Sequence, residues 1–259
     1  MVDDLIKLDV IDLVLALGLI GISIALSAWQ KLGLEVQYLF AAGRSILQLM
    51  VVGYLLALIF ALNNPIAVLA ILGIMLTIAS IVAKNRISNK IKGLFAIVWG
   101  SLFASSFLTL SYTILAIVQP DTWYQPQYLI PIAGMVLGHA INGASLAGER
   151  LVSNINNHRL EIETHLCLGA TPKQAITVYR KEAIRIGIVP TLNQMMVVGM
   201  VSLPGMFTGQ VLAGSDPLEA ASYQILILFV LAAANLMTVF LVSEGVYRKF
   251  FDRNIQLIL

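Results

Sequence analysis

Long runs of apolar residues, separated by short polar stretches, set the pattern of this chain. The runs do not alternate apolar and polar positions as the strands of a membrane barrel would. They instead approach the roughly 20 apolar residues that an α-helix needs to cross a bilayer. The pattern therefore predicts an all-α, polytopic membrane protein with about seven transmembrane helices, at residues 10–29, 45–62, 66–83, 93–118, 129–148, 183–203 and 223–247.

The amino-acid composition favours a membrane protein over a soluble one. Hydrophobic residues make up 59% of the 259 residues and charged residues only 12%, whereas soluble domains carry about 25% charged residues. Residues 1–9 are acidic, which is the wrong flank for a cleavable signal sequence, so the first span is expected to stay in the mature protein. We expect a single transmembrane domain over residues 1–259, with a cytosolic segment at about 149–182.

Positive charges are distributed unevenly between the predicted loops. In a seven-span arrangement every Lys and Arg except Lys7 falls on one side, and the loops at 63–65, 120–127 and 204–221 contain none. The positive-inside rule then places the N-terminus outside and the C-terminus in the cytosol of a bacterial inner membrane. The pattern leaves open six spans plus an interfacial helix, which would reverse one terminus.

The cytosolic segment is expected to begin as a continuation of the fifth span. Apolar residues recur near helical spacing from Leu151 to Leu166. A single helix over residues 129–168 would be roughly 60 Å long at about 1.5 Å per residue. Gly169 is expected to end it, because glycine commonly closes a helix in the left-handed conformation.

A second helix is expected to begin directly after Gly169. Thr171 suits the N-cap position, Pro172 suits the first helical position, and Gln174 follows the cap by three residues, which is the capping-box pattern. The turn is either a plain connection between two spans or a surface on which a partner docks, and the residues alone leave both open.

The fifth predicted span is rich in small residues. Gly134 and Gly138 have the G-x-x-x-G spacing that permits close contact between helix backbones, and Pro131 is expected to kink the outer end. Local packing is the simpler explanation, and a permeation path or dimer interface is the other. Pro204 and Gly205 follow the sixth span, where they either stop a helix or form a gate hinge. The candidates for the path or dimer seam are Pro131, Gly134, Met135, Gly138, His139, Asn142, Pro204 and Gly205.

Methionines gather near the sixth predicted span. Met196 and Met200 are four residues apart and so share one face of the expected helix, with Met206 close by in the sequence. Thioether sulfur is a soft ligand that suits Cu(I) better than hard cations. Met196 and Met200 are therefore candidates for a weak, transient metal path, with packing in an apolar core as the alternative.

The sequence contains no pattern typical of an enzyme. It has no nucleophile–base arrangement, no H-E-x-x-H motif and no G-x-x-x-x-G-K-[ST] loop for ATP phosphates. No series of acidic residues crosses the predicted spans, which weakens the hypothesis of a proton-coupled transporter.

Three blocks, at residues 130–142, 168–175 and 198–225, resemble in sequence and order the Fet-type iron-export permease family of ABC transporters. Plant relatives of that family are half-size permeases linked to aluminium tolerance. The resemblance covers about residues 43–247. Glu163 and Gly169 also match the EAA-x-x-x-G signature of importer permeases, with Thr164 and His165 in place of its two alanines.

The resemblance implies a permease subunit that is not itself an enzyme. It implies a homodimer in membrane lipid, a separate cytosolic ATPase that binds ATP and magnesium, export of iron or another metal ion, and no nucleic-acid partner. The alternatives are a permease for an organic solute such as a nucleotide sugar, and a secondary transporter or channel without an ATPase. The residues expected to couple to the ATPase are Glu163, Leu168, Gly169, Ala170, Thr171, Pro172, Lys173 and Gln174.

Overall fold

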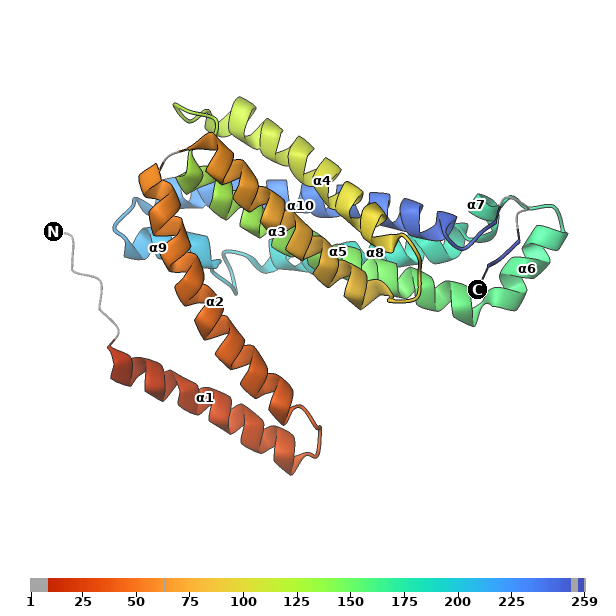
Figure 1. Ribbon diagram of the computed structural model, residues 1–259, viewed down its shortest axis with the longest axis horizontal. Helices are drawn as coiled ribbons and strands as arrows, with labels where there is room; N and C mark the ends of the chain where they lie inside the picture. Colours follow the sequence, from red (N-terminus) through yellow and green to blue (C-terminus); the bar gives the residue numbers. More distant parts are fainter. Residues whose placement is uncertain (1–8, 63, 253–255, 259) are drawn as a thin grey trace. The chain divides into compact units, whose positions relative to one another are not determined.

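The computed structural model describes residues 9–62, 64–252 and 256–258, and its secondary structure is helical throughout (Figure 1). Two isolated bridges, Val198–Ser202 and Phe251–Leu257, are the only β-type pairings in this part of the chain. The all-α prediction is confirmed. The elements are α1 (Val10–Trp29), α2 (Glu35–Leu62), α3 (Pro65–Ile87), α4 (Leu94–Tyr112), the π-helical turn η1 (Thr113–Val118), α5 (Pro126–Asn157), α6 (Arg159–Cys167), α7 (Pro172–Ala175), α8 (Thr177–Val197), α9 (Gly205–Leu212) and α10 (Pro217–Arg248).

The helices form two compact units. The first holds α1 and α2 together with residues 212–214, and the second holds residues 65–211 and 215–259. The sequence predicted a single transmembrane domain over residues 1–259, and this stays a prediction.

In the first unit, α1 and α2 form a hairpin. Its turn uses two left-handed residues, Lys31 with φ 52° and Gly33 with φ 71°. The Ser27 hydroxyl donates to Glu35 Oε1 (2.9 Å) and accepts from the Leu34 backbone N–H (3.2 Å). The second span was expected to begin at Ser45, but α2 already begins at Glu35. The carboxylate of Glu35 suits the positive end of the helix dipole, so the helix starts as soon as the turn is complete.

Six helical stretches in the described chain are long and apolar enough to cross a membrane, namely α1, α2, α3, α4 with η1, α5 and α10. The expected sixth span corresponds to α8, which carries Arg180, Lys181, Glu182 and Arg185 in its first half. The charges make α8 too polar to be recognised as a span by composition. The count of seven spans and the orientation of the termini stay predictions.

The outer boundary of the expected sixth span was wrong. A span over 183–203 was predicted, but α8 ends at Val197. Val198 takes an extended conformation and Gly199 a left-handed one with φ 82°. The Gly199 N–H donates to the Ser202 carbonyl (2.9 Å), which closes a tight turn and breaks the helical ladder.

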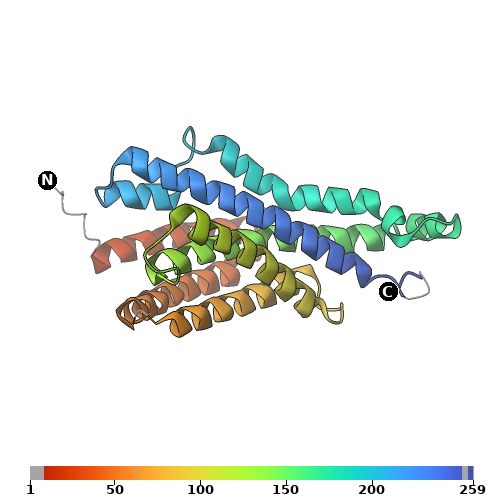
Figure 2. The same cartoon turned by 90° about the horizontal axis from the view of Figure 1, so that it is seen from above.

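In the second unit, α5 is the central helix and packs against α3, α4, α8 and α10 (Figures 1 and 2). The loop between α3 and α4, the helices α6 and α7 and the residues after α10 meet at one end. Ile87, Leu94, Ile162, Ile176 and Phe250 share a hydrophobic cluster there. We call this the basic end, because Lys84, Arg86, Arg180, Arg248 and Lys249 lie close to it.

At their midpoints, α5, α8 and α10 cross with almost no space between them. The Asn235 side chain of α10 is 1% exposed and donates from Nδ2 to the Gly187 carbonyl (3.2 Å) and to Thr191 Oγ1 (2.8 Å), both on α8. A Cβ at Gly187 would lie 2.8 Å from the Gly143 carbonyl of α5, and a side chain at Gly143 would overlap Asn235. Glycine at both positions lets the helices approach closely enough for this hydrogen bonding.

A second polar contact joins α10 to α4. The hydroxyls of Ser105 and Thr238 are 2.6 Å apart and hydrogen-bonded, and both are buried. Nearer the basic end, Gly245 lies directly against Ile97. Small residues and paired hydroxyls thus replace bulky apolar packing along this seam, as is common between helices in membranes.

Gly187→Ala should destabilise the second unit, because the new methyl group would press on a backbone carbonyl that cannot rotate away. The expected loss is about 1–3 kcal/mol, the usual range for overpacking. Thermal unfolding of the purified protein in detergent measures it. The matched control is Gly73→Ala in α3, where a Cβ meets nothing within 4 Å. Equal melting temperatures for the two variants would contradict the close crossing.

Candidate functional site

Helix α5 is longer than a membrane is thick. Its 32 residues extend about 48 Å at 1.5 Å per residue, against a hydrocarbon core of about 30 Å. Its last turns, at the basic end, carry the charged residues Glu149 and Arg150, so they are the turns expected to leave the membrane. There α5 ends at Asn157, and α6 begins at Arg159 in a different direction (Figure 1). The prediction of one continuous helix over 129–168 was wrong.

The break at His158 has a clear physical cause. His158 leaves helical geometry, with φ −113° and ψ 27°. Its ring stacks on Tyr179 of α8 with centroids 4.8 Å apart, and its Nδ1 lies 3.4 Å from Glu161 Oε2. The change of direction lets Ile162 of α6 enter the hydrophobic cluster with no exposed surface. A straight helix would have carried Ile162 away into water.

Tyr179 and Glu161 are linked electrostatically at this break. Burial raises the pKa of Tyr179 to about 12, and the hydrogen bond with Glu161 adds to the increase. The hydrogen bond from Tyr179 in turn lowers the pKa of Glu161. The phenol therefore stays protonated and the carboxylate ionised at neutral pH, which keeps the contact between α6 and α8 intact.

The predicted turn between two helices is confirmed. Gly169 is left-handed with φ 91°. Its N–H donates to the Leu166 carbonyl and the Ala170 N–H donates to the His165 carbonyl, both at 3.0 Å, which is the Schellman pattern. Thr171 and Gln174 then form the expected capping box, with the Gln174 N–H donating to Thr171 Oγ1 (3.4 Å) and the Thr171 N–H to Gln174 Oε1 (2.9 Å).

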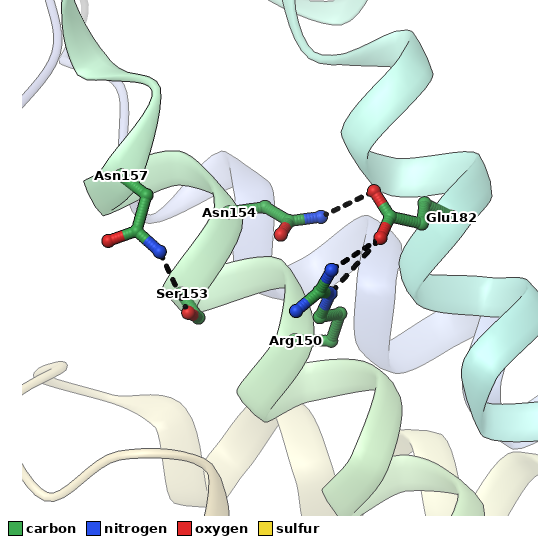
Figure 3. Close-up of polar contacts among 5 residues, drawn as sticks. All are labelled: Arg150, Ser153, Asn154, Asn157 and Glu182. Carbon is green, nitrogen blue, oxygen red and sulfur yellow. Dashed lines mark hydrogen bonds and ion pairs between the residues drawn. The ribbon is translucent and has the colours of Figure 1, made fainter.

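A charged network stabilises the base of the segment formed by α6, the turn at Gly169 and α7, which we call the hairpin from here on. The Glu182 carboxylate of α8 accepts from Arg150 Nη2 (2.6 Å) and Nε (3.2 Å), and from Asn154 Nδ2 (3.1 Å), both on α5 (Figure 3). The hydrogen bond from Arg150 lowers the pKa of Glu182. Such charge-assisted contacts are stronger than neutral hydrogen bonds, so α5 and α8 are held together where they leave the membrane.

Arg180 ties the same end of α8 to α10. Its Nη2 lies 2.7 Å from Glu244 Oε2, and its guanidinium lies over the rings of Phe240 (4.9 Å) and Tyr247 (5.6 Å). The Arg180 side chain is 11% exposed. Stacking on aromatic faces suits the planar guanidinium and compensates its loss of water.

Apolar side chains on the hairpin lie exposed. Leu160 is 82% and Leu168 79% exposed, and both lie beyond α5, outside the six apolar stretches. Beside them is a cavity of about 630 Å³ between α6, the turn and the C-terminal residues Gln256 and Leu257. Of the predicted coupling residues, Glu163, Gly169, Ala170 and Thr171 line this cavity, Leu168, Lys173 and Gln174 are exposed, and Pro172 is half-buried.

The candidates on α5 lie along one face of the helix. Pro131, Gly138 and Asn142 are exposed there, at helical spacing along a face that the other helices of the second unit leave uncovered. Met135 and His139 are half-buried beside them. Asn142 Oδ1 accepts from Arg86 Nη1 of α3 (3.1 Å). Gly134 faces only the end of the Met75 side chain and Gly138 faces open space, so the tight contacts of α5 within this chain are at Gly143 and Gly148 instead.

The candidates near the end of α8 lie apart from one another. Met196 is 64% and Met200 82% exposed. The predicted shared helix face was wrong, because α8 ends at Val197 and Met200 belongs to the turn. Pro204 and Gly205 start α9, with the Pro204 carbonyl accepting the Thr208 N–H (3.0 Å).

Two other methionines line a common cavity at the other end of the second unit. Met135 of α5 and Met206 of α9 line one cavity of about 410 Å³, together with Tyr128, Gln210 and Tyr223. Sequence reasoning missed this pair, because a sharp turn and a short helix bring Met206 back toward α5. Among the described residues, no three His, Cys, Asp or Glu side chains converge as a metal site.

Comparison with known proteins identifies the family of this chain. Residues 10–251 match the family described as "Uncharacterised protein family (UPF0014)". The chain belongs to the UPF0014 family. With its six apolar stretches, this UPF0014 protein is a multi-pass protein of the inner membrane. No solved structure matches it.

The relatives confirm the resemblance drawn from the sequence blocks. The UPF0014 membrane protein slr1647 of Synechocystis is 57% identical over 98% of both chains. The probable iron export permease protein FetB of Escherichia coli is 34% identical over 95% of this chain and 94% of its own. The protein ALUMINUM SENSITIVE 3 of Arabidopsis thaliana is 32% identical over 93% of this chain and 87% of its own.

The Arg150–Glu182 contact should contribute to stability at neutral pH and fade in acid. The folded state lowers the pKa of Glu182, so the contribution is present above the unfolded value of about 4.3 and is lost as pH falls through the folded value. Thermal unfolding of the protein and of Glu182→Gln across this range tests it. The protein should melt at the higher temperature near neutrality, and the two curves should converge in acid. Parallel curves would show that the carboxylate has no such role.

Proposed function

We propose that this chain is the membrane-spanning permease subunit of an ATP-driven, ABC-type transporter. In this proposal the chain is not an enzyme. It forms a homodimer, and each copy binds a separate cytosolic ATPase, which binds ATP and magnesium. The observation that supports the proposal is the hairpin of α6 and α7, which presents the exposed Leu160 and Leu168 beyond the six apolar stretches.

Exposed leucines on a rigid, water-facing hairpin are typical of a surface that a protein partner covers. The turn of the hairpin is closed by a Schellman pattern and a capping box, and this defined geometry supports a docking surface over a plain connection between two spans. Its base is tied to α5 through Glu182 and to α10 through Arg180. A movement of a partner bound at Leu168 would therefore reach three helices of the second unit together.

The proposed cargo is iron or another metal ion, moved outward. The name of the FetB relative, a probable iron export permease, supports this assignment. The uncovered face of α5, with Pro131, Gly138 and Asn142, is the proposed dimer seam or permeation path. Small and polar residues on a membrane helix suit such a place better than they suit lipid.

Affinity purification of the chain from its native membrane, followed by mass spectrometry, tests the partner. An ATPase with a Walker motif in roughly equal amount supports the proposal. Repeated recovery of a folded, active protein alone would favour a secondary transporter or channel. With the ATPase in hand, stimulation of ATP hydrolysis by metal ions rather than by sugars separates metal export from transport of an organic solute such as a nucleotide sugar.

Leu160→Glu combined with Leu168→Glu should weaken binding of the ATPase roughly tenfold or more, the size expected for hot-spot residues. Both side chains are about four-fifths exposed, so the fold should be unaffected. Binding of the purified ATPase to the chain in lipid nanodiscs measures the effect. Asn156→Glu, an exposed position on α5 near the hairpin, is the control for added charge. Equal binding of the ATPase by the double variant and the control would show that the hairpin is not part of the interface.

A further inference from the structure

The cavity around Met135 and Met206 lies at the end of the second unit opposite the basic end. Its walls come from the first three turns of α5, the second turn of α10 and residues 206 and 210 of α9, and all of its lining residues belong to the second unit. Its volume of about 410 Å³ falls within the range of about 300–1,000 Å³ for small-ligand sites. We call it the methionine cavity.

The lining of the methionine cavity is mostly apolar and carries no charge. Two thioethers, two phenols and two primary amides surround it, from Met135, Met206, Tyr128, Tyr223, Gln127 and Gln210. Pro131 and Ile132 complete the wall, and no lining residue is an acid, a base or a histidine. Carboxylates suit hard cations, whereas thioethers select soft ones. The lining therefore matches a soft cation of low charge.

The turn after α8 creates this arrangement. Gly199 is left-handed and its N–H donates to the Ser202 carbonyl (2.9 Å), which reverses the chain. The short helix α9 then starts at Gly205, so Met206 lies in its first turn and Gln210 one turn later. Both face the same cavity as Met135 of α5. Residues 198–225 form the last of the three blocks that resemble the permease family, and they are separate from the hairpin. This block contributes Met206, Gln210 and Tyr223 to the cavity.

We propose that the methionine cavity is a binding site for a soft, low-charge transition-metal cation, held by the thioethers of Met135 and Met206. Tyrosine faces attract cations, and the amide oxygens of glutamine can add weak contacts. With neutral donors alone the charge of the cation stays uncompensated, so the site binds weakly enough to release its ion. This inference rests on the proposed function and deepens it for a metal ion other than iron, because it names a soft cation as the cargo and the place where it is held.

Silver(I) is the probe, because it is soft, monovalent and stable to oxidation. Titration in detergent is done on the Cys167→Ser protein, which serves as the unaltered protein in these tests because the exposed Cys167 thiol would itself bind silver. It should show one silver site per chain. Met135→Leu with Met206→Leu should weaken it roughly tenfold or more, since even indirect changes at metal sites cost 10–100-fold in affinity. Leucine nearly conserves the volume of methionine, so the melting temperature of the variant should show that it is folded.

The matched control is Met196→Leu with Met200→Leu, because these methionines are exposed and line no described cavity. Unchanged silver binding in this control, with loss in the Met135 and Met206 variant, supports the proposal. Equal loss in both pairs, or no loss in the Met135 and Met206 pair, overturns it. Absence of a silver site in the unaltered protein overturns it as well.

A pH series separates thioether from imidazole binding. Thioethers do not take up protons, so silver affinity should be the same at about pH 7.5 and pH 5.5, where a histidine ligand would become protonated. A marked loss of affinity at the lower pH would assign the ion to His139, one turn from Met135 in α5, and overturn the proposal. These titrations need no ATPase, so their outcome is independent of the co-purification that tests the partner.

Discussion

The packing of the second unit depends on one crossing of three helices. Asn235 of α10 donates two hydrogen bonds to α8, and Gly143 and Gly187 provide the space that makes this approach possible. In lipid there is no hydrophobic force between helices, so close van der Waals contact and interhelical hydrogen bonds supply the association. The crossing joins α8, the most polar of the long helices, to the two that flank it, and so places α8 within the unit in spite of its charges.

Away from this crossing, the basic end is held by charges instead of small residues. Glu182 pairs with Arg150, and Arg180 pairs with Glu244 while lying over two aromatic rings. Water is within reach at this end, so charged groups can be paired here without the full penalty of burial in lipid. Helix α8 is therefore fixed at its middle by a neutral amide and at its basic end by ion pairs. Its other end leads into the turn that carries α9.

This arrangement connects the two proposed sites through one helix. The hairpin that would bind the ATPase is continuous with the first turn of α8, and the methionine cavity depends on the turn that follows its last. The crossing at Gly187 lies between the two proposed sites on α8. Pro190 lies between this crossing and the turn after Val197. It interrupts the hydrogen-bond ladder there, as proline does inside a helix.

The sequence by itself determined the elements whose signals are local. The apolar runs, the left-handed Gly169 and the capping box of Thr171 and Gln174 are encoded by neighbouring residues, so the helical class and the turn at Gly169 could be predicted. Only the tertiary structure decided the rest. The break at His158 exists because Tyr179 and the cluster around Ile162 attract α6, and the methionine pairing of residues 135 and 206 exists because a turn at Gly199 brings distant segments together. Such contacts join residues far apart along the chain, and the spacing of apolar residues within one segment does not predict them.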